Sequence, residues 1–205
     1  MMICTLRRTL GIALAAALVA VAHAAVAPGV TAPDFSLTSV DGAPVKLSQF
    51  RGKYVVLEWF NSECPFVQKH YNSGNMQGLQ STFTGKGVVW LAINSTNPKH
   101  SNYRDAKRSR QIMSDWEATP SSLLLDPDGK VGRAYSARTT PHMYIIDPDG
   151  KLVYMGGIDD KPSFSERDIP GAKNHVVAAL DELLAGQAVT NSDTRPYGCS
   201  VKYPY

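Results

Sequence analysis

The residue of this sequence best suited to chemistry is Cys64, which stands between an apolar run and a proline. The run Val55–Phe60 is apolar except for one acid, a pattern typical of a buried strand. Pro65 suits the first turn of a helix, where its missing N–H costs no hydrogen bond. Unpaired backbone N–H groups and the positive end of a helix dipole would then favour the Cys64 thiolate. This position predicts a reactive thiol; the alternative is a small buried side chain without chemistry.

The N-terminus has the pattern of a secretory signal peptide. Residues 7–8 are arginines, and the apolar run 10–21 that follows is too short to span a bilayer comfortably. Residues 22–24 fit a small-x-small cleavage motif. The predicted signal peptide covers residues 1–24, or extends to Ala27 if a second such motif is used. Uncleaved anchoring in a membrane is the alternative.

Removal of this segment would take away Cys4 and leave two cysteines, Cys64 and Cys199. In an exported protein, periplasmic or secreted, two thiols of one chain can pair. The formal charge of +3 would fall to +1, because two arginines and no acids are lost. A nearly neutral protein gives no reason to expect nucleic acid or an acidic membrane as a partner. The sequence also offers no Cys or His pairs at zinc-ligand spacing, so no metal is expected.

Short apolar runs that alternate with amphipathic segments predict an α/β fold. Strands are expected at residues 35–37, 45–48, 55–60, 88–94, 122–125, 142–146 and 152–156, and helices at 65–80, 103–116, 131–135 and 172–184. Gly74 is expected to kink or interrupt the first helix. The four-residue turn 147–150 predicts an antiparallel hairpin. These elements form a central mixed sheet with a parallel part and an antiparallel edge, flanked by helices.

The predicted domain covers residues 31–186, and residues 187–205 form a C-terminal tail that carries Cys199. The tail has no periodicity long enough to predict a helix or a strand. It is rich in aromatic residues around Tyr197, Gly198 and Cys199. We therefore expect a tail that docks on the domain rather than a frayed end.

In their order and spacing, four segments resemble a thioredoxin-fold redoxin, similar to the peroxiredoxin-like branch of the alkyl hydroperoxide reductase/thiol-specific antioxidant family. They are Ala32–Phe35 at the domain start, Val55–Cys64 as the active-site strand, Thr140–Pro141 as the cis-proline, and Ile146–Lys151 with Gly156 and Asp159 as the closing hairpin. The resemblance covers roughly residues 31–186.

Two positions depart from the family pattern. Thioredoxins carry a second cysteine three residues after the first, and here that residue is Val67, so a vicinal disulfide is impossible. Peroxiredoxins place a threonine three residues before the attacking cysteine. Here that residue is Asn61, which can still donate a hydrogen bond.

The resemblance implies roles for several residues around Cys64. Cys199 is the intramolecular candidate to resolve an oxidised Cys64; a permanent structural bridge and an unpaired thiol are the alternatives. Glu58 corresponds to the buried acid that moves protons in thioredoxins, unless it lies at a sheet edge or pairs with a lysine. Pro141 would be cis and would leave the backbone of Thr140 free to pair with an extended substrate.

Four further charged or titratable residues are weaker candidates. His142 could form a Cys–His pair with Cys64, or could point into the core. Glu63 would raise the pKa of the neighbouring thiol by like charge. Arg138 or Arg133 could supply the positive charge that peroxide-reducing sites use. The basic run from Lys99 to Arg110 is expected to be a solvated helix face.

The function predicted from the sequence is that of an exported thiol-based antioxidant oxidoreductase. Its Cys64 thiolate would reduce a hydroperoxide, with Cys199 or an external thiol reductant as the resolving partner. One alternative is thiol–disulfide exchange with protein partners. Another is a non-catalytic thioredoxin-fold module with a structural Cys64–Cys199 bridge. No cofactor, no metal, no nucleic acid and no stable membrane anchor are expected.

Overall fold

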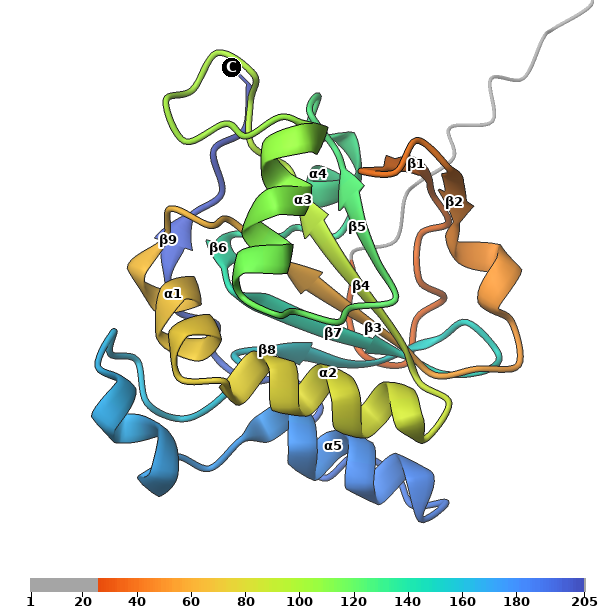
Figure 1. Cartoon of the computed structure of the whole chain (residues 1–205). Helices are drawn as coiled ribbons and strands as arrows, with labels where there is room; N and C mark the ends of the chain where they lie inside the picture. The colour runs from red at the N-terminus through yellow and green to blue at the C-terminus, as the bar shows by residue number, and fades with distance from the viewer. Residues whose placement is uncertain (1–25, 205) are drawn as a thin grey trace, which may run out of the picture.

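The computed structural model describes residues 26–204, which fold around a seven-stranded mixed sheet (Figure 1). In spatial order the strands are β2 (Pro44–Lys46), β1 (Ser36–Ser39), β5 (Ser122–Leu125), β4 (Val89–Asn94), β3 (Val55–Trp59), β7 (His142–Ile146) and β8 (Leu152–Gly156). Strands β5, β4 and β3 are parallel, and the pairs on either side are antiparallel. The predicted sheet is confirmed. The predicted signal peptide lies outside the described residues.

Helices cover both faces of this sheet. They are α1 (Pro65–Asn72), α2 (Asn75–Gly85), α3 (Ala106–Asp115), α4 (Lys130–Ala134) and α5 (His175–Leu184), with 3₁₀ turns η1 (Leu47–Phe50) and η2 (Glu166–Gly171). One apolar cluster joins the sheet to α1, α2, α3 and α5. A second cluster on the opposite face joins it to α4, η1 and the first strands. The central strands are therefore enclosed on both sides, which explains their unbroken apolar character.

Local signals set the helix ends. Gly74 has a φ of +73° and separates α1 from α2, so the predicted interruption is confirmed. Helix α3 begins later than predicted because Asp105 caps it, accepting a hydrogen bond from the backbone N–H of Arg108. Helix α5 also begins later than predicted, since Asn174 caps it in the same way. The other predicted elements recur with small changes in their bounds.

The C-terminal tail docks along the end of the sheet where Cys64 lies, as predicted. Its strand β9 (Cys199–Ser200) pairs antiparallel with β6 (Thr139–Thr140), and Cys199 stands opposite Thr140. Figure 1 shows β9 beside α1 and β6. Before β9, Thr194 N–H donates to the Met155 carbonyl at 3.0 Å. A strand of two residues is too short to have a detectable sequence period, so it was not predicted.

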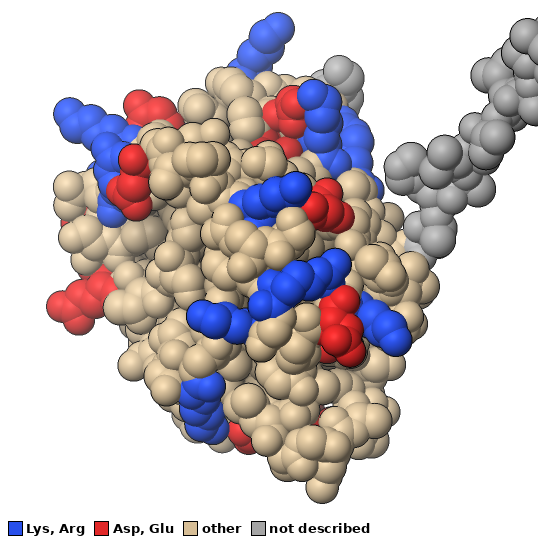
Figure 2. Space-filling model, turned by 90° about the vertical axis from the view of Figure 1, so that its right-hand side faces the viewer, with Lys and Arg blue, Asp and Glu red and all other residues tan. Residues whose placement is uncertain are grey.

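Within residues 26–204, no helix is long and apolar enough to cross a membrane. On the face drawn in Figure 2, basic and acidic side chains are interspersed among uncharged residues. That distribution agrees with the small formal charge of the sequence.

Candidate active site

Cys64 is the N-cap residue of α1, with φ −87° and ψ 120°, and Pro65 opens the helix. Its carbonyl accepts the N–H groups of Val67 and Gln68, each at 2.9 Å, which closes the first turn. The residue is 1% exposed. The sulfur therefore lies at the positive end of a helix dipole, as the sequence predicted, and it is also shielded from bulk water. Val67 is fully buried, and the position offers no second thiol.

The loop that ends in Pro141 faces this cysteine. The Thr140–Pro141 peptide bond is cis, as the resemblance implied. The Cys64 thiol donates a hydrogen bond to the carbonyl oxygen of Thr140 at 3.0 Å. The hydroxyl of Thr140 is buried and has no hydrogen-bond partner among the described residues. The backbone of Thr140 is not free, because β9 of the chain's own tail pairs with it.

The two cysteines meet at this point. Both are free thiols, Cys64 buried and Cys199 half-buried. Three effects raise the pKa of Cys199 to about 12: burial first, then the side-chain hydrogen bond with Cys64, then the negative charge of the Cys64 thiolate. The thiol of Cys199 is therefore held in its protonated form at neutral pH.

Glu58 lies in the middle of β3 and is completely buried beneath α1. Its Oε1 accepts a hydrogen bond from the Tyr71 hydroxyl at 2.9 Å, and its Oε2 accepts one from Trp90 Nε1 at 2.8 Å. Burial raises its pKa to about 7, although these hydrogen bonds oppose the rise. Glu58 is thus neither at a sheet edge nor paired with a lysine. It has no direct hydrogen bond to Cys64 in the described chain.

Asn61 and Glu63 build the turn before Cys64. The Asn61 amide donates to Thr96 Oγ1 at 3.0 Å, and its side-chain oxygen accepts the Glu63 N–H at 2.8 Å. Asn61 does donate a hydrogen bond, as its chemistry allows, and both ends of its amide hold this turn. Glu63 forms a salt bridge with Arg104 at 2.9 Å, so its charge is partly compensated. The sequence did not single out Arg104.

Among the described residues, three further candidates form no hydrogen bond with Cys64. His142 is fully buried on the opposite face of the sheet, where its ring packs on Tyr144 at 4.5 Å and its Nδ1 meets the Tyr144 hydroxyl at 2.9 Å. Burial lowers its pKa to about 3, so the ring is neutral. Arg133 packs its guanidinium on the Tyr203 ring at 4.6 Å. Arg138 is exposed. Across residues 26–204, neither arginine is a hydrogen-bond partner of Cys64.

Comparison with known proteins agrees with this geometry. The model of the AhpC/TSA family matches residues 28–155, more than half of the chain. The chain belongs to the AhpC/TSA family. A thiol-disulfide oxidoreductase, ResA of Geobacillus kaustophilus (strain HTA426), is 31% identical over 129 residues, which cover 57% of this chain and 73% of the relative.

Solved structures show that this AhpC/TSA protein has a thioredoxin-like fold. An uncharacterized conserved protein from Geobacillus kaustophilus matches it with a TM-score of 0.74 at 30% identity, over 87% of this chain and 93% of the other. A putative thiol:disulfide interchange protein, DsbE from Chlorobium tepidum, matches with a TM-score of 0.53 at 26% identity, over 64% and 85% of the two chains.

A buried polar cluster of this AhpC/TSA protein lies under the tail and was missed at the sequence level. It consists of Lys69 and His70 on α1, Asp159 after β8, and Tyr197 of the tail. Lys69 Nζ lies 3.5 Å from Asp159 Oδ2, and His70 Nε2 lies 3.8 Å from the same oxygen. The Tyr197 hydroxyl donates to Asp159 Oδ1 at 2.5 Å. These contacts hold the tail two residues before Cys199.

The environment of His70 sets the protonation state of this residue within the cluster. Burial lowers the pKa of His70 to about 4, with the neighbouring Lys69 acting in the same direction and Asp159 opposing it. His70 is therefore neutral at neutral pH, and its Nδ1 meets the Asn75 amide at 2.9 Å. One feature of the sequence could have identified His70 as a buried polar residue. His70 stands three residues after Val67 and just before Tyr71, on the apolar face of a predicted helix.

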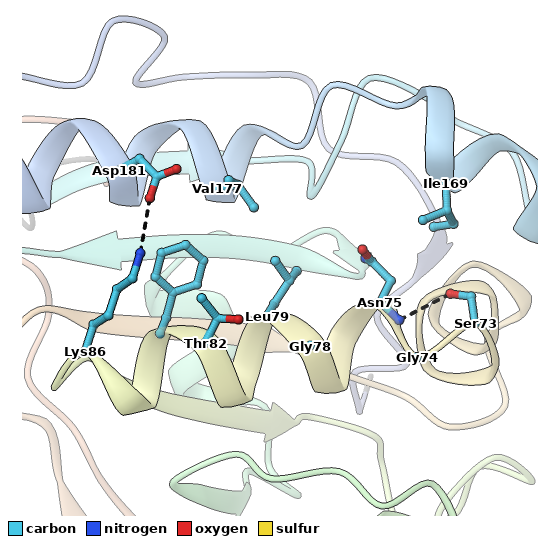
Figure 3. Close-up of a pocket in the computed structure, with 11 residues that line it drawn as sticks. Ser73, Gly74, Asn75, Gly78, Leu79, Thr82, Lys86, Ile169, Val177 and Asp181 are labelled. Carbon is cyan, nitrogen blue, oxygen red and sulfur yellow. Dashed lines mark hydrogen bonds and ion pairs between the residues drawn. The ribbon is translucent and has the colours of Figure 1, made fainter.

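The surface hollows of residues 26–204 include one beside the tail and one between two helices. One, of about 580 Å³, adjoins the tail next to the cysteine pair, and its lining includes Thr139, Arg195 and Tyr197. The other, of about 400 Å³, is a groove between α2 and α5 (Figure 3). The Lys86–Asp181 salt bridge lines it, and none of the site residues above does.

Proposed function

We propose that this protein is a thiol–disulfide oxidoreductase that uses Cys64 as the attacking thiolate and Cys199 as its second thiol. The observation that carries the proposal is that both thiols lie at Thr140: Cys64 Sγ is 3.0 Å from its carbonyl oxygen, and Cys199 stands opposite it in the β6–β9 pair. The tail thus supplies the partner that a thioredoxin has three residues after its first cysteine. The name of the relative ResA supports the same reaction class.

The reaction runs in two exchange steps. The Cys64 thiolate attacks one sulfur of a substrate disulfide, forms a mixed disulfide and releases the other substrate sulfur as a thiolate. Cys199 then attacks the Cys64 sulfur and releases the second substrate thiol. Two electrons pass from the protein to the substrate, and the protein ends with a Cys64–Cys199 disulfide that an external thiol must reduce.

The electrostatics of the site favour this order. While Cys64 is a thiolate, its charge and hydrogen bond help to keep Cys199 protonated. When Cys64 becomes part of a neutral mixed disulfide, that charge is gone and Cys199 ionises more readily. Glu58, with a pKa of about 7, is proposed as the proton acceptor behind the pair.

Hydroperoxide reduction, the first prediction from the sequence, has less support. Peroxide-reducing sites use a positive charge beside the sulfur, and Arg133 packs instead against the tail residue Tyr203. Asn61 directs its amide to Thr96. The relative ResA and the structural neighbour DsbE carry names of disulfide exchange. We therefore prefer protein disulfides as substrates.

Export to the periplasm or the exterior is part of the proposal, because it would bring the two thiols into a compartment where disulfides persist. The signal-peptide pattern of residues 1–24 supports it. Mass measurement of the protein recovered from cell fractions tests it. A mature chain that begins near residue 25 outside the cytoplasm is expected, and full-length protein in the cytoplasm would contradict it.

The test of the reaction compares the reduced wild-type chain with Cys64→Ser and Cys199→Ser. With a small aromatic disulfide, wild type should release two thiols per substrate molecule and end with a Cys64–Cys199 bond by mass spectrometry. Cys199→Ser should release one thiol and stall as a mixed disulfide on Cys64. Cys64→Ser should release none.

A parallel assay with hydrogen peroxide separates the alternatives. Oxidation of Cys64 by peroxide much faster than by the disulfide would favour a peroxidase and overturn the proposal. A Cys64–Cys199 bond that resists mild reductants and blocks exchange would indicate the non-catalytic module.

A further inference from the structure

Tyr197 occupies a built site on α1, beside the active cysteine. Its hydroxyl donates to Asp159 Oδ1 at 2.5 Å and lies 3.2 Å from His70 Nε2. Its ring stands 5.7 Å from Lys69 Nζ and packs edge-on against Phe66, with 5.8 Å between the ring centroids. Both ends of the side chain therefore have matched partners, a polar one for the phenol and an apolar and cationic one for the ring.

The polar part of this site is buried and fixed. Lys69 is 1% exposed, His70 0% and Asp159 3%. Lys69 also donates to the carbonyl of Lys161 at 3.0 Å. A buried carboxylate needs its hydrogen bonds, since an unpaired one is costly. The cluster is therefore preorganised to receive a phenol, and an aromatic side chain without a hydroxyl would leave Asp159 one partner short.

The next residue, Gly198, lies against the backbone of Thr140 with no room for a side chain. Its φ is +133°, and a Cβ there would lie 2.0 Å from the carbonyl oxygen of Thr140. That carbonyl is the acceptor of the Cys64 thiol. A strand that pairs with Thr140 in this register must therefore carry glycine immediately before its cysteine.

We propose that Phe66, Lys69, His70 and Asp159 form a recognition subsite for a tyrosine side chain, and that the site selects extended polypeptides with the sequence Tyr-Gly-Cys. Residues 197–199 of the tail fill it as an internal occupant, and an external segment would take the place of β9. This inference rests on the proposed disulfide exchange and names its substrate class.

The exposed aromatic Phe164 extends the subsite toward solvent. It is 70% exposed and packs edge-on against Phe66, with ring centroids 6.0 Å apart. A partner polypeptide that enters along β6 would meet this ring directly before its tyrosine reaches the buried cluster. The pair therefore lies where an incoming aromatic side chain would first make contact.

The test uses the full chain with Tyr197→Ala and Cys199→Ser, which empties the subsite and leaves Cys64 as the nucleophile. The probe is a synthetic peptide with the sequence of residues 195–201, its cysteine activated as a mixed disulfide with an aromatic thiol. Attack by the Cys64 thiolate forms a Cys64–peptide disulfide and expels the aromatic thiolate with the electron pair of the broken S–S bond. The release of that thiolate is followed by absorbance.

Three altered peptides measure the preference on the same protein. Replacing the peptide's tyrosine with phenylalanine should slow the reaction about tenfold, the effect of one lost hydrogen bond to a charged group. Replacing tyrosine with alanine should slow it further. Replacing the glycine with alanine should slow it by about tenfold or more, since packing overlaps of this kind cost on the order of a few kcal/mol.

A second protein, Cys199→Ser alone, keeps Tyr197 in the subsite and tests the occupancy. The unaltered peptide should react about tenfold more slowly with it than with the doubly substituted chain, because one anchored side chain must leave first. Equal rates for all four peptides on both proteins, with a small aromatic disulfide still releasing one thiol and forming a mixed disulfide on Cys64, would overturn the subsite and leave the proposed function standing. No reaction of Cys64 with the small disulfide would overturn both.

Discussion

Cys199 stands opposite Thr140 in the β6–β9 pair, and the carbonyl of Thr140 is also the acceptor of the Cys64 thiol. One backbone residue therefore places both thiols. Without a vicinal cysteine, a thioredoxin-like site needs its second thiol from elsewhere in the chain or from a partner. Here Cys199, 135 positions further along the sequence, lies at the cis-proline loop, opposite Thr140.

Gly198→Ala should separate the two cysteines. Its Cβ would overlap the Thr140 carbonyl, which should disfavour the paired position of β9 by about 1–3 kcal/mol. We expect roughly tenfold slower formation of the Cys64–Cys199 disulfide after addition of a mild oxidant, measured by thiol trapping and mass spectrometry.

The matched control is Gly186→Ala. Gly186 also has a positive φ, +74°, but a Cβ there meets nothing within 4 Å. This variant should lose about 1 kcal/mol of stability at the end of α5 and form the disulfide at the wild-type rate. Slower oxidation in both variants would show that the Gly198 contact is not specific.

Glu58→Gln should change how stability depends on pH. Burial raises the pKa of Glu58 from 4.5 to about 7, so the folded state holds this proton more tightly than the unfolded state. The contribution of Glu58 to the free energy of unfolding is therefore fully present below about pH 4.5. It is lost as pH rises through about 7, a difference of about 3 kcal/mol. Denaturant unfolding at pH 5 and pH 8 measures it.

His70 and His142 act in the opposite direction, because burial lowers their pKa values to about 4 and about 3. Their contribution is lost as pH falls below about 6.5. The quantity to compare is therefore the difference between wild type and Glu58→Gln at each pH. A difference that is constant from pH 5 to pH 8 would contradict a raised Glu58 pKa.

The same Glu58→Gln substitution should alter the pH dependence of disulfide exchange. If Glu58 accepts a proton, its wild-type rate profile contains an inflection near pH 7 that the glutamine variant lacks. The variant should be slower by about 10²-fold or more at pH 8, within the usual range for general acid–base catalysis. An unchanged profile with a lower rate would indicate a packing role only.

Two salt bridges of nearly equal length should differ strongly in energy. Lys69–Asp159 is 3.5 Å long with side chains 0% and 2% exposed, and Lys86–Asp181 is 3.6 Å long with side chains 49% and 56% exposed (Figure 3). Asp159→Ala leaves a buried lysine unpaired and should cost about 3–5 kcal/mol.

Asp181→Ala is the matched control and should cost less than about 1 kcal/mol, because water already screens the exposed pair. Urea unfolding of both variants gives the comparison. Similar losses would show that the buried pair relaxes or takes up water when its acid is removed.

Much of the fold followed from short-range patterns. The unbroken apolar runs predicted β3 and β4, and the turn at residues 147–150 predicted the β7–β8 hairpin. The helix starts were less accurate, since the caps at Asp105 and Asn174 lie inside segments that were already amphipathic. The periodicity of apolar residues identifies the buried face of a helix. It does not identify the residue at which the helix begins, because a single capping hydrogen bond has no periodic pattern.

The site was only partly predictable for a similar reason. Adjacent residues predicted the helix N-terminal position of Cys64, and the family resemblance predicted the cis bond at Pro141. The buried polar cluster under the tail joins α1 to Asp159 and Tyr197, residues far apart in the sequence whose contact depends on the docked tail. His142 was a candidate because it follows Pro141, but strand alternation turns it to the other face of the sheet.

The distance in sequence between Cys64 and Cys199 has a consequence for the lifetime of the protein. A bond between them would close a covalent ring of about 135 residues, and the chain-entropy model gives such a ring about 5 kcal/mol of stabilisation. The oxidised protein would then resist heat and proteases better than the reduced one. Because the oxidised form would be degraded more slowly, the abundance of the protein would depend on the balance between oxidants and reductants in its compartment.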